Sequence, residues 1–344
     1  MNEKINKQRR FMMTGAFALA GLSTLELAFG PTARAAALPS SASRSPLDQL
    51  RHVRTSELDI AYAELGPASG QPVILLHGWP YDIHAFEDVA PLLAAAGYRV
   101  IVPYLRGYGA TRFLSKDTFR NGQQAAIAVD IVQMMDALKI PSAVFGAFDW
   151  GARTACIVAA LHPQRVKGLV SVSGYLIGSQ AANKNPLPPQ AELEWWYQYY
   201  FATERGRAGY EANRKDFNRL IWKLASPKWA FDEATYLRSA QSFDNPDHVD
   251  VVIHNYRWRL GAAQGDAKYD EIEQKLAQFP AISVPTITME GDANGAPHPN
   301  PSAYAKKFSG KYEHRTSTGG IGHNLPQEAP RDFAQAVLDV AAMR

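Results

Sequence analysis

Short apolar runs alternate along much of the chain with segments in which apolar residues recur every three or four positions. Residues 72–76 (PVILL) form one such run, as expected for a strand that is buried on both faces of a sheet. This alternation predicts an α/β protein with a doubly wound, mostly parallel sheet. The expected strands are 57–65, 72–76, 98–103, 142–148, 166–173, 284–290 and 311–316, and the expected helices are 86–96, 123–138, 151–161 and 327–342.

The alternation stops after the strand that ends at residue 173 and resumes near residue 284. The intervening segment is rich in aromatic and charged residues and is mostly helical in its pattern. The simplest interpretation is one core domain that is interrupted by a helical cap. We therefore predict a core of residues 51–174 and 266–344, with the cap at 175–265.

Residues 1–35 have the layout of a signal peptide. A basic segment ends at Arg9-Arg10, a mildly apolar stretch follows, and a site of small residues ends it. The paired arginines and weak hydrophobicity resemble a twin-arginine signal. The alternative is a membrane anchor, which Glu26 would make costly. We expect an exported protein, periplasmic or secreted by the twin-arginine route, with a disordered leader at 36–50 and no stable membrane insertion after signal removal.

Charge and cysteine content argue against several classes of function. The net charge of +3 comes entirely from residues 1–35, and the remainder carries 31 basic and 31 acidic residues. Nothing in this balance indicates nucleic acid or an anionic membrane surface as a partner. The single cysteine, Cys156, excludes an intramolecular disulfide and a cysteine cluster for zinc, and its apolar surroundings predict a buried structural role. We expect no metal and no organic cofactor.

The segment SAVFGAFDWGA places Asp149 between a predicted strand and a predicted helix. Ala147 and Gly151 flank it at two residues on either side, and both are as small as the tight turn of a nucleophile elbow requires. Serine usually occupies this position. A carboxylate is already an anion at neutral pH and can attack a saturated carbon directly, and the resulting ester must be hydrolysed by activated water. The alternative is a structural aspartate that caps the helix.

Partners for this nucleophile lie at the expected places in the chain. The loop His77-Gly78-Trp79-Pro80 follows the strand at 72–76, so the N–H groups of Trp79 and Trp150 are candidates for an oxyanion hole. His323 is the candidate base, because the elbow and the loop at 77–80 are similar to those of α/β-hydrolases, which carry their histidine between the last strand and the last helix, where His323 lies. His77 is expected to hold the oxyanion loop together. The remaining histidines considered lack a comparable context: His84, His298 and His314.

The acid that would orient His323 has two candidates. The strand at 284–290 ends in Glu290-Gly291-Asp292-Ala293-Asn294, and the position three residues after the glycine, which often carries the acid, is Asn294. We predict Asp292 as the acid, with Glu290 as the alternative.

These motifs resemble the epoxide hydrolase and haloalkane dehalogenase branch of the α/β-hydrolases. HGWP at 77–80 is similar to the H-G-x-P loop of this branch, RGYG at 106–109 to a segment common in epoxide hydrolases, and DWG at 149–151 to the elbow of both groups. The resemblance covers the chain from about residue 52. It implies the α/β-hydrolase fold with a helical cap inserted after the sixth strand.

The resemblance to epoxide hydrolases implies two cap tyrosines that donate phenol protons to the oxygen of the epoxide ring. The segment 196–201 (WYQYYF) resembles the first, which nominates Tyr197, and 255–257 (NYR) resembles the second, which nominates Tyr256. A phenol is a weak acid that can donate without carrying a charge. The implied substrate is a small apolar or aromatic epoxide. The alternative is that these aromatic residues only pack the cap.

Two further functions remain open. A haloalkane or haloacid dehalogenase would use the same Asp149 nucleophile: Trp150 with Trp195 or Trp196 could bind the halide, and Arg153 would suit a substrate carboxylate. A non-catalytic exported binding protein could keep the fold without turnover, although the pairing of a carboxylate with a late histidine argues against it.

Overall fold

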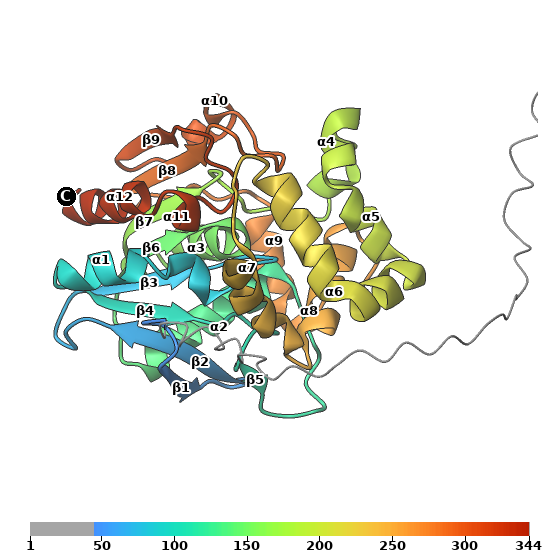
Figure 1. Cartoon of the computed structure of the whole chain (residues 1–344), viewed down its shortest axis with the longest axis horizontal. Helices are drawn as coiled ribbons and strands as arrows, with labels where there is room; N and C mark the ends of the chain where they lie inside the picture. The colour runs from blue at the N-terminus through green and yellow to red at the C-terminus, as the bar shows by residue number, and fades with distance from the viewer. Residues whose placement is uncertain (1–44, 344) are drawn as a thin grey trace, which may run out of the picture. The chain divides into compact units, whose positions relative to one another are not determined.

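The computed structural model describes residues 45–343 (Figure 1). The predicted signal peptide at 1–35 and most of the predicted leader lie outside the described residues. The leader prediction does not hold for residues 45–50, because Leu47 is fully buried in the core and the N–H of Ser45 donates to the Asp48 carboxylate (2.9 Å). Within residues 45–343, no helix is both long enough and apolar enough to cross a membrane.

The strands form one sheet in the order β1-β2-β4-β3-β6-β7-β8-β9, with β5 beside β2. The pairs from β4 to β9 are parallel, and β2 is antiparallel to its three neighbours, so the predicted mostly parallel sheet is confirmed. The strands are β1 (Leu50–Arg54), β2 (Leu58–Leu65), β3 (Pro72–Leu76), β4 (Arg99–Pro103), β5 (Arg112–Phe113), β6 (Ala143–Ala147), β7 (Val166–Val172), β8 (Thr286–Gly291) and β9 (Tyr312–Ser317).

Helices cover both faces of the sheet. Helix α1 (Val89–Ala95) packs on α12 (Pro330–Ala342), and α2 (Gln124–Ala137) packs on α3 (Asp149–Leu161), and these two pairs lie on opposite faces (Figure 1). The predicted helix at 327–342 is divided into α11 (Leu325–Glu328) and α12. The division follows from Pro330, which lacks an N–H and disfavours helical backbone at the residue before it.

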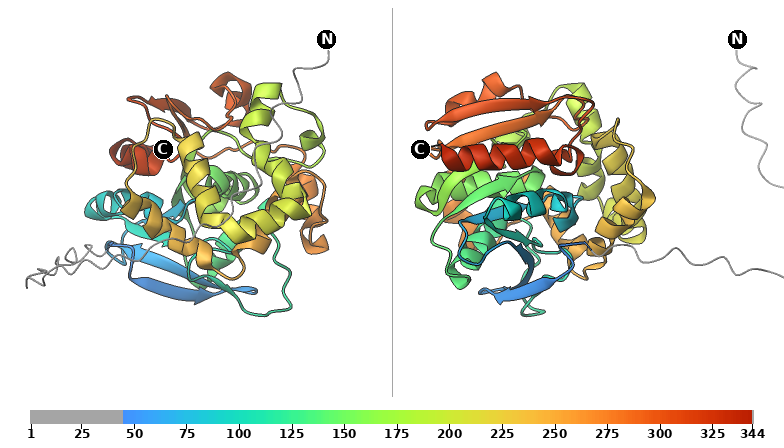
Figure 2. Two further views of the ribbon diagram at one scale, coloured as in Figure 1. Left: turned by 45° about the vertical axis from the view of Figure 1, so that its right-hand side comes forward. Right: turned by 60° about the vertical axis from the view of Figure 1, so that its left-hand side comes forward.

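The cap consists of helices between β7 and β8. Helix α5 packs against both α6 and α8, and the group stands beside the end of the sheet at which β6 leads into α3 (Figures 1 and 2). Because β5 has only two residues, the cap follows the sixth strand of the main sheet, as expected. Its helices are α4 (Pro189–Glu194), α5 (Trp196–Ala202), α6 (Glu204–Ala225), α7 (Glu233–Ala240) and α8 (His248–Arg259).

Candidate active site

Asp149 occupies a sharp turn between β6 and α3. Its φ is +52°, a left-handed conformation that is uncommon for a residue other than glycine. The turn is possible because two residues packed around it are glycines: a Cβ at Gly151 would lie 2.1 Å from the Leu76 carbonyl oxygen, and a Cβ at Gly78 would lie 2.3 Å from Asp149 Oδ1. The local geometry is therefore that of a nucleophile elbow, with the carboxylate presented at the carboxyl end of β6.

Backbone donors bind one side of this carboxylate. The N–H of Trp79 donates to Asp149 Oδ1 (2.7 Å), and the N–H of Trp150 also interacts with the carboxylate. Burial alone would raise the pKa of Asp149, but the hydrogen bond and charge of His323, the charge of Arg153 and the Trp150 N–H together lower it. Asp149 is therefore an anion at neutral pH, and both sequence-predicted oxyanion donors lie at it.

His77 holds the loop that carries Trp79. Its Nε2 accepts from the N–H of Leu105 (3.2 Å), and its Nδ1 lies 3.1 Å from the Gly78 carbonyl oxygen. Burial lowers the pKa of His77 to about 4, so the ring is neutral and can serve both partners at once. These contacts fix the position of the loop that carries Trp79.

His323 lies on the other side of the carboxylate. Its Nε2 is 3.4 Å from Asp149 Oδ2, and the two side chains are 10% and 22% exposed. Burial would lower the pKa of His323, but the hydrogen bond to Asp149 and its charge raise it, and the charges of Glu290 and Glu328 act in the same direction. The structure thus brings together the predicted nucleophile and the predicted base, in a site that is largely closed to water.

The structure does not place Asp292 beside the imidazole. Its two carboxylate oxygens accept from the N–H groups of Gly319, Gly320 and Ile321, at 2.8 to 3.0 Å. These bonds shape the turn that precedes His323 and lower the pKa of Asp292. The predicted acid therefore supports the histidine loop and does not contact the ring.

Glu290, the sequence alternative, is better placed. It is the penultimate residue of β8, is buried, and accepts from Nδ2 of Asn294 (2.7 Å), the residue at the usual position of the acid. Its charge raises the pKa of His323, whereas Asp292 is not among the groups that do so. Nδ1 of His323 is buried and has no hydrogen-bond partner among residues 45–343, so the nitrogen that an acid would bind is unoccupied.

Residues at the end of the cap helix α6 bind the backbone of the histidine loop. The sequence did not indicate this contact. The carbonyl of Ala225, at the end of α6, accepts from the N–H of His323 (3.2 Å), and Ser226 Oγ lies 3.0 Å from the same N–H. Ser226 in turn donates to Glu328 (2.6 Å), whose other oxygen accepts from the N–H of Gly322 (2.7 Å). Serine and glutamate are too common on helix ends for the sequence to have indicated this contact.

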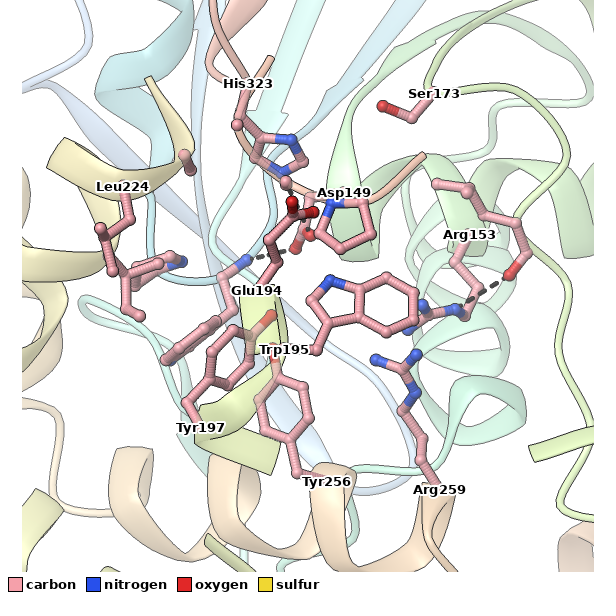
Figure 3. Close-up of a pocket in the computed structure, with 18 of the residues that line it drawn as sticks. Asp149, Arg153, Ser173, Glu194, Trp195, Tyr197, Leu224, Tyr256, Arg259 and His323 are labelled. Carbon is pink, nitrogen blue, oxygen red and sulfur yellow. Dashed lines mark hydrogen bonds and ion pairs between the residues drawn. The ribbon is translucent and has the colours of Figure 1, made fainter. Parts of the chain in front are cut away.

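The two predicted cap tyrosines face the carboxylate from α5 and α8. The ring centroids of Tyr197 and Tyr256 are 5.3 Å apart, and Trp79 contacts both rings. Figure 3 shows the two phenols side by side below Asp149. Burial raises the pKa of both phenols, and the charge of Asp149 acts in the same direction, so both groups are protonated donors at neutral pH.

These residues line one pocket of about 120 Å³ between the core and the cap. One wall is apolar and contains Ile221 and Leu224. The opposite wall contains Arg153 and Arg259, of which the second was not identified from the sequence. Cys156 is buried in α3, and residues 45–343 contain no cluster of three or more His, Cys, Asp or Glu side chains that could hold a metal.

Comparison with known proteins agrees with this geometry. Residues 71–258 match the alpha/beta hydrolase fold family. The crystal structure of a proposed epoxide hydrolase from Klebsiella pneumoniae subsp. pneumoniae is 61% identical, covers 87% of this chain and 99% of that chain, and has a TM-score of 0.86.

Two curated relatives match shorter segments. Epoxide hydrolase B of Mycobacterium tuberculosis is 34% identical over 150 residues, which are 40% of this chain and 41% of that protein. Haloalkane dehalogenase of Mycobacterium marinum is 32% identical over 126 residues, which are 36% of this chain and 40% of that protein. The matched segments thus span about two fifths of these relatives. The chain belongs to the alpha/beta hydrolase fold family.

Proposed function

We propose that this protein opens epoxides to diols through a covalent ester on Asp149. The observation that carries the proposal is the position of two protonated phenols, Tyr197 and Tyr256, in the same pocket as an ionised carboxylate. Epoxide opening needs a nucleophile at carbon and a proton donor at the ring oxygen, and these groups supply both.

In the first step, Asp149 Oδ2 attacks one carbon of the epoxide and the bond between that carbon and the ring oxygen breaks. Oδ1 accepts from the Trp79 N–H at 2.7 Å, whereas Oδ2 lies at the longer distance of 3.4 Å from His323 Nε2, so Oδ2 is the less tightly held oxygen. The ring oxygen takes a proton from Tyr197 or Tyr256, which leaves a hydroxyl group on the alkyl ester. The full mass of the epoxide is now attached to the enzyme.

In the second step, neutral His323 removes a proton from water, and the hydroxide attacks the ester carbonyl carbon. The carbonyl oxygen becomes an oxyanion that the N–H groups of Trp79 and Trp150 stabilise. Loss of one such donor typically costs about 3 kcal/mol. Collapse of this intermediate releases the diol and regenerates the Asp149 carboxylate, and the proton on His323 returns through the product or solvent to the phenol.

We further propose that Glu290 orients His323 through Nδ1 in the second step. Because the negative charge of Glu290 raises the pKa of His323, the Glu290→Gln protein should have a histidine with a lower pKa. The base must be neutral to act, so the acidic limb of the kcat–pH profile should move to lower pH. The maximal kcat should fall by roughly 10-fold or more, because the imidazolium loses its counter-charge.

Asp292→Asn is the matched control for this prediction. It removes a carboxylate two residues away that binds only the loop backbone. We expect a lower melting temperature with no shift of the acidic limb. A shift in the Asp292→Asn profile and none in the Glu290→Gln profile would return the role of acid to Asp292.

The arrangement is less suited to a haloalkane dehalogenase. A halide site would need two N–H donors pointing into the pocket, but Nε1 of Trp79 is bound to the Tyr210 hydroxyl (3.0 Å). Nε1 of Trp150 is buried and has no hydrogen-bond partner among residues 45–343, but Trp150 is not among the residues that line the pocket. Of the predicted halide donors, only Trp195 reaches the pocket, so one donor remains where two are needed.

A panel of terminal epoxides and haloalkanes of equal chain length, tested with the unaltered protein and with Tyr256→Phe, separates the two functions. The unaltered protein should form diols. Tyr256→Phe should lower kcat for epoxides by about 10²-fold, within the range of general acid catalysis. Halide release that Tyr256→Phe leaves unchanged, with no diol formed, would instead support the dehalogenase.

A further inference from the structure

Two arginines stand together on one wall of the pocket. Arg153 is in α3, four residues after Asp149, and Arg259 is the last residue of α8. Both line the catalytic pocket, and both also line a second pocket of about 190 Å³ beside it. Figure 3 shows their guanidinium groups next to each other beside the indole of Trp195.

Neither arginine has an acidic partner. Within residues 45–343, no carboxylate oxygen lies within 4.0 Å of a guanidinium nitrogen of Arg153 or Arg259. Arg153 donates from Nε to the Leu176 carbonyl oxygen (3.0 Å), which leaves its terminal nitrogens free. Arg257, two residues from Arg259 on the same helix, does have an acidic partner, because it forms an ion pair with Glu204 at 3.0 Å.

Two neighbouring positive charges in a partly buried wall repel each other. Burial and the charge of Arg259 lower the pKa of Arg153 to about 10, so it is still charged at neutral pH. The charge of Asp149 favours the charged form of Arg153 but does not cancel the repulsion, because the pKa of Arg153 is still lowered. Asp149 is bound by Trp79 and His323, and Glu194, which also lines the pocket, makes no ion pair with either arginine.

We propose that Arg153 and Arg259 bind a carboxylate of the substrate, so that the enzyme acts on epoxides of carboxylic acids. A planar carboxylate can accept parallel hydrogen bonds from a guanidinium group, and two such groups side by side bind it with more donors than either alone. This inference rests on the proposed function and narrows its substrate class.

The rest of the pocket fits a molecule with one charged end. Figure 3 shows Leu224 and the arginine pair on opposite sides of Asp149. Ile221, three residues before Leu224 on α6, also lines the pocket, so an apolar group would lie at these residues while the carboxylate lies at the arginines. The substrate would thus still carry the apolar or aromatic group that the sequence led us to expect, and it would carry a carboxylate as well.

The test compares 3-phenylglycidate with its methyl ester, which differ in charge but share the epoxide and the ring. The unaltered protein should have the higher kcat/KM for the anion. Arg259→Gln should lower kcat/KM for the anion by about 10- to 100-fold more than for the ester, with the additional loss mainly in KM. Arg259→Lys, which keeps the charge, should retain much of the preference.

Arg205→Gln is the matched control, because it removes one positive charge from an exposed position on the cap helix α6. It should change neither value. Equal kcat/KM for the two epoxides, unaffected by Arg259→Gln, would overturn the anion site while leaving epoxide hydrolysis in place.

A binding measurement separates this inference from the proposed function. Phenylacetate and the neutral phenylacetamide are compared by titration calorimetry with the unaltered protein and with Arg259→Gln. We expect phenylacetate to bind at least about 10-fold more tightly, and Arg259→Gln to abolish the difference. If the protein binds phenylacetate in this way but opens neither epoxide, the anion site is supported and epoxide hydrolysis is rejected. Equal binding of the two compounds would overturn the anion site.

Discussion

Asp149→Asn is expected to lower kcat for epoxide opening by at least about 10⁴-fold and to abolish any covalent adduct. The carboxamide has almost the shape of the carboxylate but is a far weaker nucleophile, so the first step does not occur. Asparagine also tolerates a φ of +52° better than most residues, and the variant should therefore fold. Diol formation and the intact protein mass after incubation with substrate measure both parts of the prediction.

Two controls make this result specific. A melting temperature close to that of the unaltered protein would show that the elbow is intact. The mass should be followed over time, because deamidation of the new asparagine would restore the aspartate and its activity. Turnover within about 10-fold of the unaltered protein, with no deamidation, would mean that another group attacks the epoxide.

His323→Gln is expected to separate the two steps. Asp149 should still open the epoxide, because its charge and the Trp79 N–H remain, but the ester should accumulate because no base activates water. Steady-state kcat should fall by about 10³-fold, within the range that general base catalysis contributes. The protein mass should rise by the full mass of one epoxide, since opening expels no leaving group.

The size of that mass increase also distinguishes the reactions. A haloalkane would add only its alkyl group, because the halide leaves. The backbone N–H at residue 323 is unaffected by the substitution, so its bonds to Ala225 and Ser226 persist. If the unaltered protein is active but the His323→Gln protein consumes no epoxide in a single turnover and stays unmodified, His323 is needed for ring opening as well. That result would contradict the proposal that His323 acts only as the base of the second step.

Local patterns predicted the parts of this protein that depend on neighbouring residues in the chain. The apolar run of β3 indicated a central strand, and four of its five residues are fully buried. The small residues around Asp149 indicated a tight turn, and the structure has a positive φ there. Both features follow from steric and burial requirements that act within a few residues.

The choice between Asp292 and Glu290 depended on contacts that no local pattern contains. The two carboxylates are two residues apart, and either could face the histidine loop. Asp292 is bound by N–H groups 27 to 29 positions further along the chain, which direct its side chain away from His323. Arg259 was missed for a similar reason, since the packing of α8 decides that it lines the pocket while Arg257 binds Glu204.

The bonds from the end of α6 to the backbone at His323 restrict how this scaffold can be re-engineered. Residues 225 and 226 belong to the inserted region, yet they supply acceptors for the N–H of His323 in the core. A chimaera that exchanges the whole inserted region for that of a relative would therefore change the alignment of the histidine together with the specificity. Grafts that begin after β7 and stop before residue 225 would keep these acceptors and, under the proposed mechanism, leave the step at His323 undisturbed.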